Sequence, residues 1–344
     1  MGVTVKTFGK TKDKQDIFLY TISNANGMSA SVTNFGAILV SLFAPDSNGE
    51  LKDVVLGLEK GTDYYKNGSF FGATVGRNAN RIGGASAVID GVTYNFPVND
   101  GPNNLHTDFA VGMHMKLWDA VIGENCVTFS VVSPDKEAGF PGNVKAEVTY
   151  TLTADNAIEI KYNAVSDKKT IINMTNHTYF NLAGHDAGSI EDTVLQLNCS
   201  KYTPVVKGAI PTGELADVAG TVFDFTTEKT IGQDIRAKEK QLKLVKGYDH
   251  NFVVDGYDGT MRKIAVAKAA GRTMEVYSDL PGVQFYAGNC IGKQKGKGGF
   301  KYNKRHGFCL ETQYFPDNAN QNTFKKAIFD ANEVYSTTTV YKFV

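Results

Sequence analysis

The sequence predicts an all-β fold, a large antiparallel β-sandwich with a few short helices. Three observations support this prediction: turn dipeptides recur along the chain, the segments between them alternate apolar and polar residues, and helix-forming stretches are few. Strands do not alternate with helices as they do in a parallel sheet. No Pro-rich, Ser-rich or charge-block linker divides the chain, so we expect a single domain over residues 1–344.

Seven Asn-Gly or Asp-Gly pairs mark the expected turns, because these residues tolerate the positive φ angles of a tight hairpin. The 35 glycines of the chain agree with a fold that contains many turns. The seven pairs are Asn26-Gly27, Asn48-Gly49, Asn67-Gly68, Asp90-Gly91, Asp100-Gly101, Asp255-Gly256 and Asp258-Gly259.

The expected strands follow in chain order. Residues 35–44 are almost all apolar, which is typical of a buried strand and too short to cross a bilayer. Residues 88–96 predict a hairpin around Asp90-Gly91, and residues 147–152 and 158–162 alternate with a period of two around the turn at 154–156. The expected short helices are residues 58–65 and 231–242.

Charge and cysteine content exclude several classes of protein. The 36 Lys and Arg residues balance 36 Asp and Glu residues, whereas nucleic-acid and anionic-membrane binders usually carry a basic excess. Four widely spaced cysteines without a CxxC motif predict reduced thiols rather than a zinc site. The first ten residues contain no apolar leader. We therefore expect a cytoplasmic protein that binds neither nucleic acid nor membrane.

The most biased stretch is residues 293–305, with six basic residues in thirteen. Its glycines favour a flexible, solvated loop, and the alternative is a loop that steers anions beside a cleft. No phosphate cradle, GxSxG elbow or HExxH pair occurs in the chain. These absences from the sequence argue against a nucleotide enzyme, a serine hydrolase and a zinc protease.

Two histidines stand in unusual surroundings. His177 lies in residues 173–182 (NMTNHTYFNL), where many hydrogen-bonding side chains crowd a strand-like run. Such side chains are costly to bury unless they bind one another or a polar ligand, so a hydrogen-bonded core histidine explains the pattern equally well. His106 lies in the loop 99–108 (NDGPNNLHTD), which suits a residue at the mouth of a site.

Three charged residues complete the set of candidates. Arg81 follows small and amide residues in GRNANRI, and a structural ion pair is its simpler explanation. Asp249 in GYDHNF and Glu311 in FCLETQ are carboxylates with apolar neighbours, which predicts a partner or a shifted pKa for each. The set has no metal-binding motif. Carboxylates, amides, an arginine and nearby aromatic rings together indicate a ligand rich in hydroxyl groups, such as a sugar.

Six sequence motifs show a resemblance to a known protein family. The chain resembles the aldose 1-epimerase family over essentially its full length, with the motifs in the same order: GRNANRI, NNLH, NHTYFNL, GYDHNF, PGVQFYAGN and LETQYFPD. The resemblance implies a single-domain β-supersandwich with an open cleft. It also implies an isomerase that interconverts the α and β anomers of free hexoses, such as galactose and glucose, without a cofactor or metal.

The resemblance also implies roles for individual residues. Glu311 would be the base that takes the proton of the C1 hydroxyl, and His177 would be the acid that protonates the ring oxygen. His106 would orient the sugar and support charge. The residues expected to bind sugar hydroxyls are Arg81 and Asp249, with Asn80 and Gln284 as weaker candidates.

This scheme carries one physical expectation and leaves alternatives open. His177 is expected to hold a proton near pH 7 beside an ionised Glu311. The rival functions are a glycosidase that uses Asp249 and Glu311, and a sugar-binding sandwich without catalysis. A hexose-6-phosphate epimerase is a further alternative that depends only on the basic loop around Lys297. The sequence is silent on the oligomeric state and on the preferred sugar.

Overall fold

A computed structural model describes residues 2–344, and it is built from antiparallel sheets. The N-terminal sheet has five strands in sequence order, each paired with the next. Its strands are β1 (Gly2–Lys10), β2 (Asp16–Ser23), β3 (Ser29–Thr33), β4 (Ile38–Pro45) and β5 (Leu51–Asp53).

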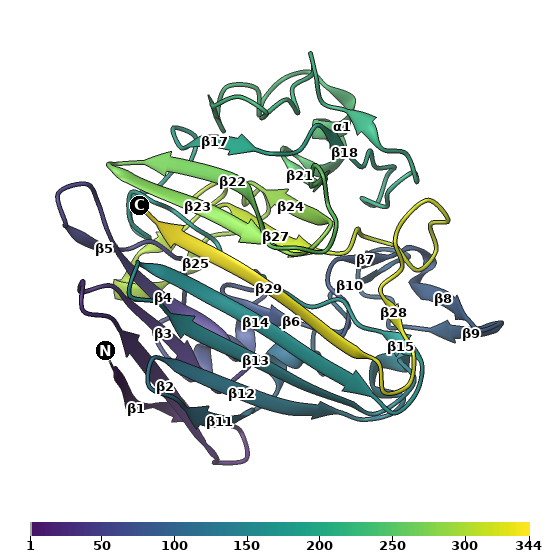
Figure 1. Ribbon diagram of the computed structural model, residues 1–344, viewed down its shortest axis with the longest axis horizontal. Coiled ribbons are helices and arrows are strands. Elements are labelled where there is room, and N and C mark those ends of the chain that lie inside the picture. The colour runs from purple at the N-terminus through teal and green to yellow at the C-terminus, as the bar shows by residue number, and fades with distance from the viewer. Residues whose placement is uncertain (1) are drawn as a thin grey trace.

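A nine-stranded sheet crosses the middle of the molecule, with the C-terminal strand β29 between β14 and β23 (Figure 1). This order brings the last strand of the chain into the centre of the sheet. In order across the sheet, the strands are β11 (Asp119–Ile122), β12 (Cys126–Ser133), β13 (Val144–Leu152), β14 (Ala157–Ser166), β29 (Val334–Phe343), β23 (Arg272–Ser278), β22 (Arg262–Ala269), β17 (Val194–Leu197) and β20 (Lys229–Thr230).

A second five-stranded sheet and five strand pairs form the rest of the architecture. The sheet runs β19 (Ala216–Asp217), β18 (Lys201–Tyr202), β21 (Asp249–Val253), β24 (Gly282–Tyr286) and β27 (Cys309–Gln313). The pairs are β6 (Ala73–Val75) with β16 (Thr175–His177), β7 (Arg81–Ile82) with β10 (Asn104–Leu105), β8 (Ser86–Ile89) with β9 (Val92–Asn95), β15 (Thr170–Ile171) with β28 (Ile328–Phe329), and β25 (Gln294–Lys295) with β26 (Lys301–Tyr302).

Helical structure is short throughout residues 2–344. The α-helix is α1 (Lys240–Val245), and the 3-10 turns are η1 (Gly61–Lys66), η2 (Gly83–Ala85), η3 (Met113–Met115), η4 (Glu137–Gly139) and η5 (Lys297–Gly299). None of these helices is long and apolar enough to span a bilayer.

The all-β prediction is confirmed, and so are its most regular elements. Strands β13 and β14 pair in the register that the alternating segments predict, and alternate residues of β13 are buried. Asp90 and Gly91 both have positive φ angles, 50° and 77°, as the turn between β8 and β9 requires. The apolar run 35–44 supplies the buried strand β4.

The two helix predictions were only partly right. Residues 58–65 contain most of the 3-10 turn η1. Residues 231–242 are helical only at their end, where α1 begins at Lys240. The physical reason is tertiary pairing: the backbone N–H groups of Ile231 and Gly232 donate to the carbonyl oxygens of Thr193 and Glu191. These bonds tie the start of the segment to the chain just before β17, and residues 231–236 form turns instead of a helix.

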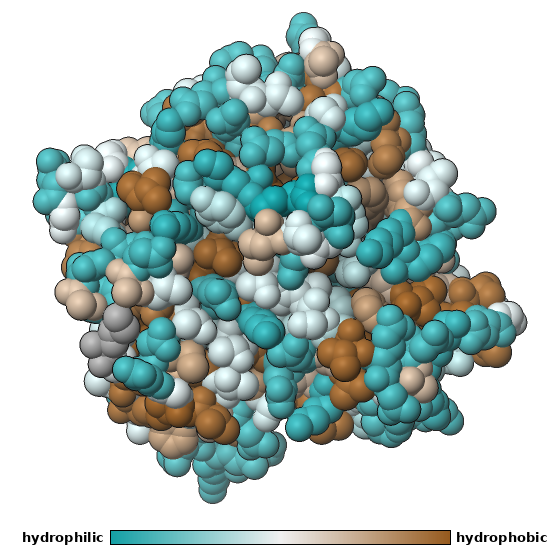
Figure 2. Space-filling view, viewed as in Figure 1, coloured by the Kyte–Doolittle hydropathy of each residue, from teal (hydrophilic) through white to brown (hydrophobic). Residues whose placement is uncertain are grey.

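The core lies between the N-terminal sheet and the nine-stranded sheet. Tyr20 of β2 meets the ring of Phe129 of β12 edge-on at 5.5 Å, and Phe129 in turn contacts Tyr150 of β13. On the face drawn in Figure 2, hydrophilic side chains cover most of the surface and apolar residues lie between them in small groups. Isolated exposed apolar residues of this kind are ordinary on a folded protein.

Candidate active site

Six of the seven predicted site residues line one cleft of about 270 Å³. The seventh, Gln284, lies behind Asp249 and donates a hydrogen bond from Nε2 to its Oδ1 at 2.7 Å. The residues of this cleft are Gly68, Ser69, Phe70, Asn80, Arg81, Asp100, Leu105, His106, Phe109, His177, Tyr179, Asp249, Tyr286, Cys290 and Glu311.

Strand pairing brings the polar groups together. In the sheet order β21, β24, β27, Gln284 stands opposite Asn251 on one side and Glu311 on the other. Asp249 lies two residues before Asn251 and therefore projects on the same face of the sheet. The strand β16, which carries His177, lies beside β27. Residues that are more than sixty positions apart in the chain thus meet at one place.

Glu311 and His177 face each other across the cleft. The distance from His177 Nε2 to Glu311 Oε1 is 3.7 Å, and the two side chains are only 7% and 3% exposed, respectively. Glu311 Oε2 has no hydrogen-bond partner among residues 2–344. A buried carboxylate oxygen without a partner is expensive in a folded protein.

The pKa shifts of this pair run against the charge state expected from the sequence. Burial lowers the pKa of His177 to about 4, and burial together with the charge of Asp249 raises the pKa of Glu311 well above its usual value. The 3.7 Å separation is too long for a hydrogen bond that would offset the cost of burying both charges. Burial therefore favours the uncharged form of each side chain.

His106 is held by the backbone on the wall of the cleft. Its Nδ1 accepts a hydrogen bond from the backbone N–H of Asn80 at 3.1 Å, which leaves Nε2 free. His106 adopts a positive φ of 53°, and its own N–H donates to the carbonyl oxygen of Asn80. Burial and the neighbouring His177 lower the pKa of His106 well below its usual value. His106 is therefore a neutral residue with one ring nitrogen for a ligand.

Arg81 and Asp249 form the polar end of the cleft. Arg81 donates from Nε to Asp100 Oδ2 at 2.8 Å, while its Nη1 lies 4.0 Å from Asp249 Oδ2. Burial raises the pKa of Asp249, and Arg81 opposes that rise. Since Asp100 binds only Nε, the Nη groups of Arg81 remain available to sugar hydroxyls.

The sequence interpretation missed Asp100, and it expected aromatic rings at the site without naming the ones that line the cleft. Asp100 lies in the same loop as His106, so that loop carried a signal for it. Tyr179 stacks on the His177 ring at 4.9 Å, Phe70 contacts the same ring at 5.9 Å, and Tyr286 meets it edge-on at 6.2 Å. Such rings give the C–H faces of a sugar an apolar surface.

Comparisons with known proteins agree with this geometry. A family model described as aldose 1-epimerase matches residues 19–342. The chain belongs to the aldose 1-epimerase family. It is accordingly an isomerase, and the resemblance inferred from the six motifs is confirmed.

Several relatives of this aldose 1-epimerase cover nearly all of the chain. A protein named galactose mutarotase from Bos taurus is 40% identical over 318 residues, 92% of this chain and 91% of that protein. An aldose 1-epimerase from Escherichia coli is 36% identical over 96% of both chains. The crystal structure of galactose 1-epimerase from Lactobacillus acidophilus superposes with a TM-score of 0.87 at 30% identity, covering 100% of this chain and 99% of the other.

The cluster of His106, His177 and Glu311 in the cleft contains atom types that bind metals. One ligand atom each from His106, His177 and Glu311 lies within 4.8 Å of the others. In a tetrahedral zinc site with bonds of about 2.0–2.1 Å, ligand atoms stand about 3.4 Å apart. The 3.7 Å between His177 Nε2 and Glu311 Oε1 is longer than that spacing.

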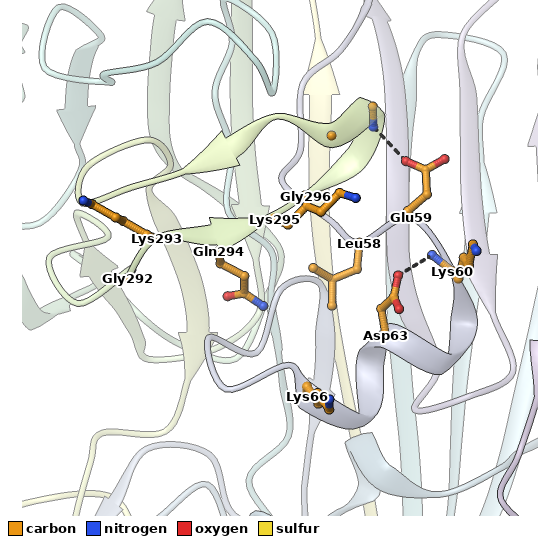
Figure 3. A pocket seen from close by; sticks show the side chains of 12 residues that line it. Leu58, Glu59, Lys60, Asp63, Lys66, Gly292, Lys293, Gln294, Lys295 and Gly296 are labelled. Carbon is orange, nitrogen blue, oxygen red and sulfur yellow. Dashed lines mark hydrogen bonds between the residues drawn. The ribbon is translucent and has the colours of Figure 1, made fainter.

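The basic stretch 293–305 borders a different cavity, of about 790 Å³ (Figure 3). This cavity lies between the β25 segment and the η1 turn, and Glu59 closes one end by accepting the backbone N–H of Gly298. Lys297 points away from it: Nζ donates to Asp53 Oδ2 at 2.5 Å and to the carbonyl oxygens of Val40 and Val55. Lys297 therefore anchors the loop instead of lining this cavity.

Proposed function

We propose that this cleft interconverts the α and β anomers of free aldoses, with galactose and glucose among its substrates. The observation that carries the proposal is the facing pair of Glu311 and His177 in a cleft of about 270 Å³. The proposal is supported by 40% identity to a protein named galactose mutarotase over nearly the whole chain. No cofactor enters the scheme.

The reaction needs two proton transfers, one from the C1 hydroxyl and one to the ring oxygen. In the proposed scheme, Glu311 takes the proton of the C1 hydroxyl while His177 gives a proton to the ring oxygen, and the ring opens to the aldehyde. Rotation about the C1–C2 bond presents the other face, and the two residues reverse their roles as the ring closes. Positioned acid–base groups typically contribute about 10²- to 10⁴-fold in rate.

The directions of the two pKa shifts fit one stage of this cycle. A protonated Glu311 with a neutral His177 holds the same number of protons as an ionised Glu311 with a protonated His177. In the scheme, the first state accompanies the open sugar and the second accompanies the closed ring. A closed sugar favours the second state, because its C1 hydroxyl donates to the carboxylate and its ring oxygen accepts from the imidazolium.

The remaining polar residues are proposed to orient the sugar. Arg81 and Asp249 would bind hydroxyl groups at the polar end of the cleft, and Gln284 would hold Asp249 in place through its 2.7 Å hydrogen bond. His106 would donate or accept at its free Nε2, and Asn80 would act through the backbone bond that holds His106. The rings of Tyr179 and Phe70 would cover a face of the sugar.

Polarimetry tests this function directly. Fresh α-galactose and α-glucose are expected to reach rotational equilibrium faster with the enzyme than in buffer alone. A trace at the buffer rate would leave only sugar binding and would overturn the proposal. Release of a chromophore from aryl glycosides would instead support the glycosidase alternative, and we expect none.

We also propose a cytoplasmic location. It is supported by the four cysteines, which are free thiols, since such thiols persist in reducing compartments. Fractionation of cells that express the tagged chain would test the location.

A further inference from the structure

One contact of His177 has no part in the scheme above. The Sγ of Cys309 lies 3.4 Å from His177 Nδ1, within hydrogen-bond range for sulfur. Cys309 is fully buried and His177 is 6% exposed. The imidazole thus has a partner at each nitrogen: the thiol at Nδ1 and Glu311 at Nε2.

One strand supplies both partners. Cys309 and Glu311 are two residues apart on β27, so their side chains project from the same face of the sheet. The strand therefore spans the imidazole edge, with a thiol beside one nitrogen and a carboxyl group beside the other. This arrangement needs the Cys-x-Glu spacing and is independent of the rest of the cleft.

The contact between Cys309 Sγ and His177 Nδ1 bears on the orientation of the imidazole ring. A half-turn of the imidazole about its Cβ–Cγ bond would place carbon atoms, instead of Nδ1 and Nε2, opposite the thiol and Glu311. The rings of Tyr179 and Phe70 restrict tilting of the imidazole but accept either of its two faces, because stacking does not distinguish nitrogen from carbon. The thiol contact does distinguish nitrogen from carbon, and so does the hydrogen bond of the ring to the backbone of His177 itself.

A thiol is a suitable partner for an acid catalyst. It is a weak donor and a weak acceptor, so it can accept from Nδ1–H or donate to a bare Nδ1. A carboxylate at this position would stabilise the imidazolium and make it a poorer acid. Burial raises the pKa of Cys309, so the group stays a neutral thiol. The other titratable groups that face the ring are His106, His114, Tyr179, Tyr286 and Glu311.

We propose that Cys309 is a positioning residue: its thiol holds Nδ1 of His177 so that Nε2 stays aimed at the sugar and at Glu311. This inference rests on the proposed function for its kinetic consequence, whereas the contact itself is independent of any activity.

Substitution at Cys309 tests the inference with an internal rescue. Cys309→Ala is expected to lower kcat about three- to tenfold with KM for galactose unchanged, the kinetic equivalent of one ordinary hydrogen bond. Cys309→Ser retains a donor and acceptor and should restore kcat to within about twofold. Cys199→Ala is the matched control: it removes another buried thiol, outside the cleft, and should leave kcat unchanged.

A spectroscopic readout separates the contact from catalysis. The ring ¹⁵N shift of His177 Nδ1 is expected to change in Cys309→Ala and to stay near the wild-type value in Cys199→Ala. Wild-type kcat and an unchanged Nδ1 shift in Cys309→Ala would overturn the inference, and so would equal losses in the Ala and Ser variants. A wild-type chain that does not accelerate mutarotation would overturn the proposed function instead, while the Nδ1 shift would still decide the contact.

Discussion

At Glu311, the burial of a carboxyl group sets the chemistry of the cleft. Its side chain is 3% exposed, one oxygen has no hydrogen-bond partner in residues 2–344, and its pKa is raised. A group in this state costs stability, and a proton donor from a ligand offsets that cost. The proposed scheme thus assigns the role of base to a carboxyl group that is buried and lacks a hydrogen-bond partner at one oxygen.

Replacing Glu311 separates this catalytic role from stability. Glu311→Gln keeps the shape of the side chain but removes the base, so we expect kcat to fall by about 10²- to 10⁴-fold. The melting temperature should be unchanged or higher, because no buried group remains to be ionised. Polarimetry and circular dichroism on the same sample measure both. A variant that keeps more than a tenth of the wild-type kcat would remove the base assignment.

The pH dependence of the reaction follows from the same environment. The scheme needs one proton on the pair of Glu311 and His177. Since the pKa of Glu311 is raised and that of His177 is lowered, the pair loses this proton as the pH rises through the pKa of Glu311, and kcat/KM falls there. Asp249 contributes to the raised pKa of Glu311. Asp249→Asn removes its negative charge, so this alkaline limb should move to lower pH. Asp249→Glu retains the charge and should keep the midpoint; equal midpoints in both variants would contradict the coupling.

Asp100 is the site residue that the sequence interpretation did not find. Its carboxylate fixes Arg81 Nε at 2.8 Å, and Asp100→Asn weakens that bond. We expect KM for galactose to rise about two- to fivefold with kcat little changed, since the ion pair is partly exposed. Asp90→Asn, which alters an exposed carboxylate paired with Lys169, is the control and should change neither constant. A fall in kcat without a rise in KM would assign Asp100 to the chemical step.

Among the secondary-structure elements, the strands with a regular alternation of apolar and polar residues were predictable from the sequence. The alternation in β13 and β14 gave their pairing, and the Asp90-Gly91 turn gave the β8–β9 hairpin. The segment that carries His177 is different: only Thr175–His177 is strand, and it pairs with the short strand β6. Motif resemblance identified this residue, because a three-residue strand has no periodicity to detect.

Some features depend on contacts between distant parts of the chain. Gln284 was placed among the sugar-binding residues, yet it reaches Asp249 only through the pairing of β21 with β24. The charge state of His177 likewise depends on burial, which sequence neighbours do not reveal. Identities of site residues were predictable from motifs, whereas their electrostatics needed the packed structure.

The β25–β26 segment is anchored to the N-terminal sheet by one buried ion pair. Lys297 Nζ and Asp53 Oδ2 are 2.5 Å apart, with side chains 12% and 8% exposed. Lys297→Met leaves Asp53 without its partner, so we expect a loss of about 3 kcal/mol in the free energy of unfolding, measured by urea denaturation. The exposed Lys295→Met is the control and should cost less than about 0.5 kcal/mol. Equal stability of the two variants would show that the pair does not anchor the segment.

At the scale of the whole molecule, the C-terminal strand β29 joins the two halves of the nine-stranded sheet, which are β11 to β14 on one side and β23, β22, β17 and β20 on the other. β29 lies between β14 and β23 in the nine-stranded sheet. It also contacts the segments that carry Glu311 and His177: Tyr341 donates from its hydroxyl to the carbonyl oxygen of Leu310, beside Glu311, and the Tyr335 hydroxyl accepts from the backbone N–H of Met174. We therefore propose that the chain folds as one domain that is completed only by its C-terminal strand.

Two truncations, one at each end of the chain, test this single-domain proposal. Removal of residues 334–344 splits the nine-stranded sheet and withdraws both tyrosine contacts, so we expect an unfolded or aggregated product without mutarotase activity. Removal of residues 2–10 deletes an edge strand of similar length whose residues are all partly or fully exposed, so we expect a folded enzyme with a lower melting temperature and measurable kcat. Circular dichroism, a melting curve and polarimetry on both chains provide the comparison. A folded, active chain that ends at residue 333 would show that the halves of the sheet are stable without β29, and the single-domain proposal would then fail.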